Sequence, residues 1–270
     1  MLSSDLQDLA ERYRTDGFVF LPELLPGNLL AELRRNLPSV LKEAGPQRFL
    51  EQDGVTVRAV YGLHKRDGVW REVSEEPTLT EIAHTLLGEA IYVYQWKINP
   101  KSPRTGDEWA WHRDYAYWKI EDGMPTPHAV TAGILLDDVS EENGPLQLVP
   151  ASHLIGPLPE ELEHEAHSQT ALRESNNWAQ VVSKSLAYTV SSESVEALSR
   201  QHGLFSACGP AGSTVFFHSN IIHGSAPNRS SSPRTLALIT YNSISNAPKH
   251  WSNPRPDFFI NHNPKPLSQL

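Results

Sequence analysis

The chain has 270 residues, of which 39% are hydrophobic and 20% charged, as is typical of a globular protein with a buried core. Its formal net charge of −9 argues against nucleic acid or an anionic membrane as the main partner, so we expect a small-molecule ligand. The single cysteine excludes an internal disulfide, and neither a signal segment nor a long apolar run is present, so we expect a cytoplasmic protein without a membrane span. Charge and composition do not indicate the oligomeric state.

Helical patterns come first along the chain. Three segments combine helical periodicity with start or stop signals: the stretch from Ser4 to a stop at Gly17, residues 28–44, and residues 77–87 followed by Gly88. Pro38 is expected to disturb the second of these helices.

Strand patterns dominate the rest of the chain. Seven segments are rich in β-branched or aromatic residues and are bounded by Gly, Pro, Asp or Asn: residues 55–62, 90–99, 108–114, 129–139, 144–150, 213–226 and 234–244. Helices followed by many spaced strands predict a mainly β protein, with two packed sheets and helices outside one of them.

We expect one domain over residues 1–270, with N-terminal helices over 1–88 and the β core over about 90–156 and 205–250. Residues 157–210 are polar and acidic with weak periodicity, which indicates an insertion that is part helix and part loop. Such an insertion is either a lid over the site or a solvated excursion without a role, and the pattern favours neither.

The first candidate site is the pair His112 and Asp114, which lies among five aromatic residues at 109–118. If this segment is a strand, the two side chains point to the same face, and alternation divides the aromatic residues between both faces. The pair suits a metal site, but it equally suits a buried ion pair. Taken alone, it does not decide between them.

A second motif favours the metal site over the buried ion pair. His223 ends an apolar strand and precedes a glycine and a turn-rich loop, and Arg234 opens the next strand. Two histidines and one carboxylate hold non-haem Fe(II) on one side and leave positions open for a 2-oxo acid and dioxygen. An arginine then suits the far carboxylate of that acid. His218 is the alternative third ligand, but its strand position and the spacing to Arg234 favour His223.

These motifs resemble a known family. The phytanoyl-CoA dioxygenase family of Fe(II)/2-oxoglutarate-dependent oxygenases is similar in the segments "WHRDYAYWKIEDGMP", "NGPLQLVPASH" and "HGSAPNRSSSPRT". Within the family, "EDGMP" resembles the ectoine hydroxylases. A broader likeness to griselimycin-type free-leucine hydroxylases includes "VRAVYGLH", "YQWKIN", "ITYNSISNAPK" and "PRPDFFI". The resemblance covers nearly the whole chain and is weakest across 157–205.

The resemblance implies a double-stranded β-helix, or jelly roll, with Fe(II) held by His112, Asp114 and His223. It implies that Arg234 binds the C5 carboxylate of 2-oxoglutarate. It also implies that Thr131 contacts the same carboxylate, and that Lys97 and Gln95 face the cosubstrate or substrate. Dioxygen is the other cosubstrate, and ascorbate helps to keep the iron reduced.

Candidate substrate residues are less well defined. Arg58 lies in a predicted strand and is a candidate for binding a substrate carboxylate, although it is equally a surface arginine. Asn242 and Trp118 match substrate-contacting positions of ectoine hydroxylases, and Tyr115 belongs to the aromatic wall. Tyr115 and Lys119 lie where the sequence departs from the ectoine hydroxylase signature, so a free amino acid or similar zwitterion is the expected substrate.

The expected reaction is hydroxylation of an unactivated C–H, with succinate and carbon dioxide as the other products. Desaturation, demethylation or ring formation on a natural-product intermediate would use the same chemistry. A zinc hydrolase could use the same three ligands, but it gives no role to Arg234. A non-catalytic jelly-roll binding or sensor module is the alternative of another class.

Overall fold

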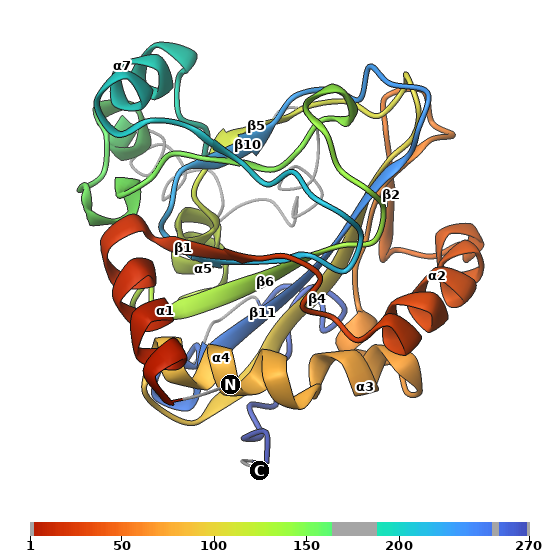
Figure 1. Cartoon of the computed structure of the whole chain (residues 1–270), viewed down its shortest axis with the longest axis horizontal. Helices are drawn as coiled ribbons and strands as arrows, with labels where there is room; N and C mark the ends of the chain where they lie inside the picture. Colours follow the sequence, from red (N-terminus) through yellow and green to blue (C-terminus); the bar gives the residue numbers. More distant parts are fainter. Residues whose placement is uncertain (1–2, 164–187, 250–253, 269–270) are drawn as a thin grey trace.

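The computed structural model describes residues 3–163, 188–249 and 254–268, and it contains two antiparallel sheets that face each other (Figure 1). This arrangement confirms the predicted jelly-roll core. The seven-stranded sheet has the order β1 (Phe18–Leu21), β9 (Thr214–His218), β6 (Ala129–Leu135), β11 (Arg234–Ser243), β4 (Ile91–Lys101), β3 (Val57–Val60) and β2 (Arg48–Leu50). The four-stranded sheet has the order β5 (Trp109–His112), β10 (His223–Ser225), β7 (Gln147–Leu148) and β8 (Phe205–Ser206).

Helices cover the outer face of the larger sheet (Figure 1). These are α1 (Ser3–Asp16), α2 (Gly27–Lys42), α3 (Val69–Ser74) and α4 (Pro77–Leu87). Three of them confirm the predicted helices. The short α3 is an addition, and Pro38 lies inside α2 without ending it. Two further helices, α5 (Asp114–Asp122) and α7 (Ser192–His202), lie toward the smaller sheet. In the described ranges, every helix is too short or too polar to cross a lipid bilayer.

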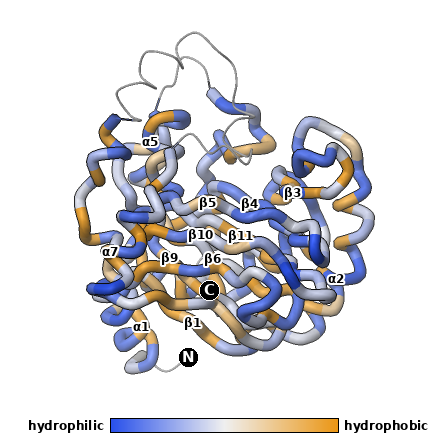
Figure 2. The backbone as a smooth tube through the Cα atoms, turned by 90° about the horizontal axis from the view of Figure 1, so that it is seen from above, coloured by the Kyte–Doolittle hydropathy of each residue, from blue (hydrophilic) through white to orange (hydrophobic). Residues whose placement is uncertain are grey.

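Strand β11 shows how the larger sheet divides its side chains. Ala237, Ile239 and Tyr241 belong to the core that packs under the helices, whereas Leu236 and Leu238 belong to a second cluster between the two sheets. This is the period of two expected of a strand that is buried on both faces. Figure 2 shows hydrophobic stretches along the strands in the middle of the molecule.

A third cluster, rich in aromatic residues, lies between α5 and the inner face of the larger sheet. We call it the aromatic cluster, and its buried aromatic members are Tyr61, Tyr92, Tyr94, Tyr117, Trp118, Tyr188 and Phe259. Buried polar side chains of β4 and β5 lie near these apolar clusters, and two of them, Asn99 and His112, line the cavity described below.

The predicted strand over residues 108–114 is wrong at its C-terminal end. Strand β5 stops at His112, and Asp114 begins α5, which ends at Gly123 with a φ of 70°. An acidic residue in the first turn and a glycine after the last residue are favourable helix boundaries. Of the predicted insertion, residues 164–187 lie outside the described part of the chain, so the lid remains a prediction.

Candidate metal centre

Two histidines face each other across neighbouring strands of the smaller sheet. His112 on β5 pairs with His223 on β10, and their ring centroids are 4.3 Å apart. The Nδ1 atom of His112 lies 2.7 Å from the carbonyl oxygen of Ala110, and that of His223 lies 3.0 Å from the carbonyl oxygen of Ile221. With hydrogen on each Nδ1, both Nε2 lone pairs are left for a shared ligand, as is typical of metal-bound histidines.

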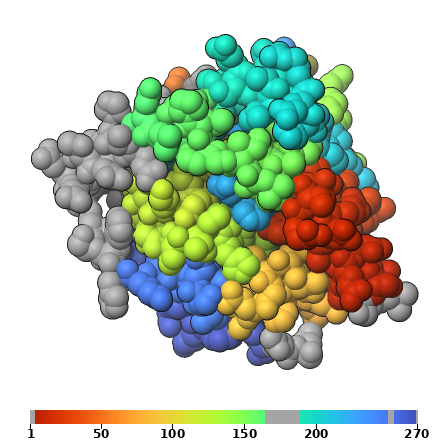
Figure 3. All heavy atoms as spheres, turned by 90° about the vertical axis from the view of Figure 1, so that its left-hand side faces the viewer, coloured from red at the N-terminus to blue at the C-terminus, as the bar shows by residue number. Residues whose placement is uncertain are grey.

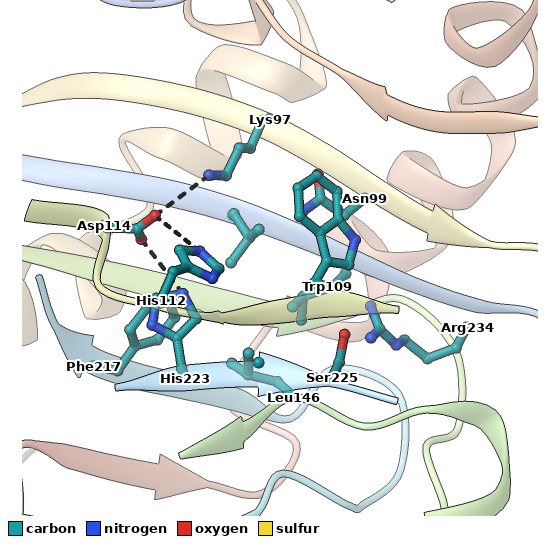
Figure 4. A pocket seen from close by; sticks show the side chains of 13 residues that line it. Lys97, Asn99, Trp109, His112, Asp114, Leu146, Phe217, His223, Ser225 and Arg234 are labelled. Atoms are coloured by element: carbon teal, nitrogen blue, oxygen red, sulfur yellow. Dashed lines mark ion pairs between the residues drawn. The ribbon is translucent and has the colours of Figure 1, made fainter. Parts of the chain in front are cut away.

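Asp114 completes a compact donor group. Its Oδ1 lies 3.8 Å from Nε2 of His112, and its Oδ2 lies 3.8 Å from Nε2 of His223. One donor atom from each of the three residues lies within 4.8 Å of the other two, and all three residues are buried (Figure 4). Within the described ranges, no other histidine, cysteine or acidic residues form such a group.

The charges of this group suit a divalent metal. Burial lowers the pKa of His112 to about 3 and also lowers that of His223, so both imidazoles are neutral near pH 7. Burial raises the pKa of Asp114, but nearby charges, Lys97 first among them, oppose this effect, and the net shift is downward. Two neutral nitrogens and one carboxylate form the facial donor set that binds Fe(II) in non-haem oxygenases.

The donor group lies in a cavity lined by both sheets and the start of α5 (Figure 4). The other lining residues include Lys97, Asn99, Trp109, Phe217, Ser225, Arg234, Leu236 and Leu238. Arg234 is separated from the donor group in this view, and its Nε donates to the carbonyl oxygen of Gly144 at 2.8 Å. Burial lowers its pKa to about 10, so the guanidinium is charged near pH 7. Among the described residues, no carboxylate forms an ion pair with it.

Of the other predicted cosubstrate residues, Lys97 lines the cavity, with Nζ 3.9 Å from Asp114 Oδ1. The register does not bring Thr131 to Arg234. Thr131 pairs with Thr240, and their hydroxyl oxygens are 3.0 Å apart. Thr240 is six residues from Arg234 along β11, or about 20 Å in an extended strand, so Thr131 cannot reach a carboxylate held by Arg234.

Gln95 occupies the same cross-strand row as Thr131 and does not line this cavity. Its Nε2 donates to the carbonyl oxygen of Phe259 at 3.0 Å, and its buried Oε1 has no hydrogen-bond partner among the described residues. Gln95 therefore faces the aromatic cluster rather than Arg234.

Arg58 is neither a surface arginine nor part of the cavity wall. Its Nη1 lies 2.9 Å from Glu51 Oε2, its Nη2 donates to the carbonyl oxygen of Glu108, and its guanidinium lies 3.9 Å from the centre of the Trp109 ring. It is 1% exposed. Because Trp109 lines the cavity, Arg58 supports that wall from behind, and the structure does not place it where it could bind a substrate carboxylate.

The remaining substrate candidates lie around the aromatic cluster. Asn242 donates to Tyr92 Oη at 3.1 Å, and Trp118 packs edge-on against Tyr94 with ring centroids 5.4 Å apart. Tyr115 donates its hydroxyl to the carbonyl oxygen of Pro125 at 3.0 Å. None of the three candidates lines the cavity that contains Arg234.

Two residues of this region were not singled out from the sequence. Asn99 lines the cavity with a buried Oδ1 that has no partner among the described residues. Lys101 is 1% exposed, and burial, followed by the charges of Arg234 and Arg58, lowers its pKa to about 6. Both follow Lys97 at intervals of two along β4, so strand alternation was the pattern that could have identified them.

His218 lies apart from the donor group. Its Nδ1 accepts a hydrogen bond from the Asn220 backbone N–H at 3.0 Å, and its ring centroid is 5.0 Å from that of His153. It lines a separate pocket with His128 and His153, so its side chain is not available to the cavity that contains the donor group.

The fold and the donor group define a class of protein, namely jelly rolls with two histidines and one carboxylate around a common point. The profile of the phytanoyl-CoA dioxygenase (PhyH) family matches residues 13–236. The chain belongs to this family.

Similar proteins extend over nearly the whole chain. L-proline trans-4-hydroxylase of Streptomyces griseoviridis is 38% identical over 266 residues, which cover 98% of this chain and 96% of that protein. Ectoine dioxygenase of Stutzerimonas stutzeri is 34% identical over 268 residues, which cover 96% and 85%. The crystal structure of EctD from S. alaskensis with 2-oxoglutarate and 5-hydroxyectoine matches the fold with a TM-score of 0.79 at 23% identity, covering 100% of this chain and 87% of that one.

Proposed function

We propose that the protein is an Fe(II)- and 2-oxoglutarate-dependent dioxygenase that hydroxylates a free amino acid or a similar small zwitterion. The observation that carries this proposal is one cavity with two components. One is a group of two neutral imidazoles and a charged carboxylate, and the other is the charged guanidinium of Arg234, which has no carboxylate partner among the described residues.

The roles of the residues follow from their positions. His112, Asp114 and His223 would hold Fe(II), which when bound supplies the reduction of dioxygen coupled to conversion of 2-oxoglutarate to succinate and carbon dioxide. Arg234 is suited to bind the far carboxylate of the cosubstrate through its planar donors. Leu236 and Leu238 make the wall between them apolar and exclude water from it.

The substrate class rests on the relatives. L-proline trans-4-hydroxylase and ectoine dioxygenase are named for small zwitterionic compounds, and each matches more than nine-tenths of this chain. The departure from the ectoine signature at Tyr115 and Lys119 favours an amino acid over ectoine. We also propose a cytoplasmic location, because one cysteine suits a reducing compartment.

The test is anaerobic titration of the protein with Fe(II) and 2-oxoglutarate, followed by turnover with a panel of free amino acids that includes L-proline, L-leucine and ectoine. We expect a weak visible charge-transfer band, succinate formation and a product heavier by one oxygen atom. Asp114→Ala should abolish product formation, whereas Asp53→Ala, in an exposed turn, should not. A protein that binds no 2-oxoglutarate and turns over no substrate would instead be a binding module, and one that binds zinc and hydrolyses a substrate would be a hydrolase.

A further inference from the structure

Arg113 lies between the candidate metal ligands His112 and Asp114 in the sequence, but it does not line the cavity. It is 3% exposed. Its Nη1 donates to the carbonyl oxygens of Ser152 at 2.9 Å and Asn220 at 2.7 Å, and its Nη2 donates to that of Gly156 at 3.5 Å. Its Nε lies 3.0 Å from Glu161 Oε1. One guanidinium therefore joins the His112–Asp114 turn to two other parts of the chain.

The first of these parts leads to the other histidine ligand. Asn220 lies three residues before His223. Ser152, which accepts from Arg113 through its carbonyl oxygen, also accepts through its hydroxyl from the backbone N–H of Ile222 at 2.9 Å. Arg113 and Ser152 thus connect the turn that holds His112 to the segment that holds His223.

The second part is the segment that contains Glu161. Its carboxylate is nearly buried and accepts from the backbone N–H of Leu158 at 2.8 Å. The neighbouring Glu160 carboxylate accepts from the hydroxyls of Ser191 and Ser194 at the start of α7. Figure 3 shows this segment (green) beside α7 (cyan) and above the segment that contains α5 (lime). These hydrogen bonds hold the segment in place independently of Arg113, and so they fix the position of the Glu161 carboxylate that pairs with Arg113.

We infer that the buried Arg113–Glu161 ion pair is a positioning pair for the metal centre, which keeps the His112–Asp114 turn and the His223 segment in the arrangement that binds metal. The inference rests on the proposed function, because it requires a metal at this centre. Lysine could not replace the arginine fully, since an ammonium is a point charge and cannot span these acceptors as a planar fork does. Loss of a residue that orients metal ligands in this way usually lowers the metal affinity by about 10- to 100-fold.

The experiment measures Co(II) binding to the metal-free protein through the visible ligand-field absorption, for the wild type, Arg113→Met, Arg113→Lys, Glu161→Gln and the Arg113→Met/Glu161→Gln double variant. We expect dissociation constants about 10- to 100-fold higher for Arg113→Met and Glu161→Gln, with a smaller rise for Arg113→Lys. The double variant should bind Co(II) about as weakly as Arg113→Met, because both lack the guanidinium that joins the two ligand segments. It should unfold at a higher temperature than Arg113→Met, because it no longer leaves the Glu161 carboxylate as an uncompensated buried charge. Thermal unfolding of each metal-free variant is recorded in parallel.

Arg34→Met is the matched control. Its Nε donates to the carbonyl oxygen of Leu136 at 2.6 Å, and it belongs to α2, away from the centre. It should lower stability without changing Co(II) affinity or the absorption spectrum. Folded Glu161→Gln and Arg113→Lys proteins that bind Co(II) as the wild type does would overturn the positioning role. Failure of the wild type itself to bind Fe(II) or Co(II) would refute the metal centre and with it the proposed function.

Discussion

Two cations that line the cavity have different surroundings. Lys97 lies beside the Asp114 carboxylate, so its charge is partly balanced by the protein. Within the described part of the chain, Arg234 has only a carbonyl oxygen as its hydrogen-bond partner, although Asp137 contributes at longer range to its electrostatic environment. A buried charge without an adjacent counter-charge is costly, and an anionic ligand would remove that cost. Arg234 is therefore the residue whose loss should affect the cosubstrate most.

Arg234→Met should raise the KM for 2-oxoglutarate at least about 30-fold, because removing one partner of a buried charged pair costs about 2–5 kcal/mol. Steady-state kinetics at saturating substrate measure the change, and Co(II) affinity should stay at the wild-type value. Arg234→Lys is the control for geometry, since it keeps the charge but loses the two-pronged donor set. Its KM should fall between those of the wild type and Arg234→Met, and an unchanged KM in both variants would remove Arg234 from the cosubstrate site.

At the scale of elements, the turn from β5 into α5 explains both a success and an error of prediction. His112 and Asp114 were expected to converge because they shared one face of a strand. They converge instead because a strand ends at the first residue and a helix begins at the second. Period-two alternation in a short aromatic stretch cannot reveal this change, since Tyr117 and Trp118 suit a buried strand as well as a buried helix.

The C-terminus of helix α4 allows a test of why a glycine follows the helix. Gly88 follows its last residue with a φ of 71°, and a Cβ atom there would meet nothing within 4 Å. Gly88→Ala should therefore destabilise the protein by about 1 kcal/mol through backbone strain alone. Gly27, the first residue of α2, also has open space but no positive φ, so Gly27→Ala should be neutral or slightly stabilising. Urea unfolding of both variants measures the difference, and equal effects would contradict the strain argument.

At the scale of the whole molecule, the sequence predicted the fold class, three helices and the residues that meet in the donor group. Hydrophobic periodicity is a local pattern and indicated the helices and strands. The distant His223 was assigned to the same group as His112 and Asp114 from the combined motifs and the family resemblance. The partners of Arg58 and Thr131 could not be predicted, because they depend on strand register and on contacts between distant segments. Glu51 is close to Arg58 along the chain, but Trp109 reaches it only through the packing of the two sheets.

Histidines whose pKa is lowered in the folded protein make its stability sensitive to acid. Burial, with the charges of His153 and other neighbours, lowers the pKa of His218 from 6.5 to about 3. Between those values the unfolded chain takes up a proton that the folded protein does not, so stability is lost as pH falls through this window. His218→Asn keeps an acceptor for the Asn220 N–H. Urea unfolding of metal-free protein at pH 7, 5.5 and 4.5 should show a shallower decline for this variant, and parallel declines would contradict the assignment.

The two histidines belong to the four-stranded sheet and Arg234 to the seven-stranded sheet. An oxo-diacid bound as proposed would therefore be attached at one end to each sheet. The distance between the sheets then sets the length of the diacid that fits. A diacid one carbon shorter could not contact the metal centre and Arg234 at once, and a diacid one carbon longer would fit only in a bent conformation. Selection of the cosubstrate by length is in this way a property of the jelly roll itself, set by sheet packing rather than by any single side chain.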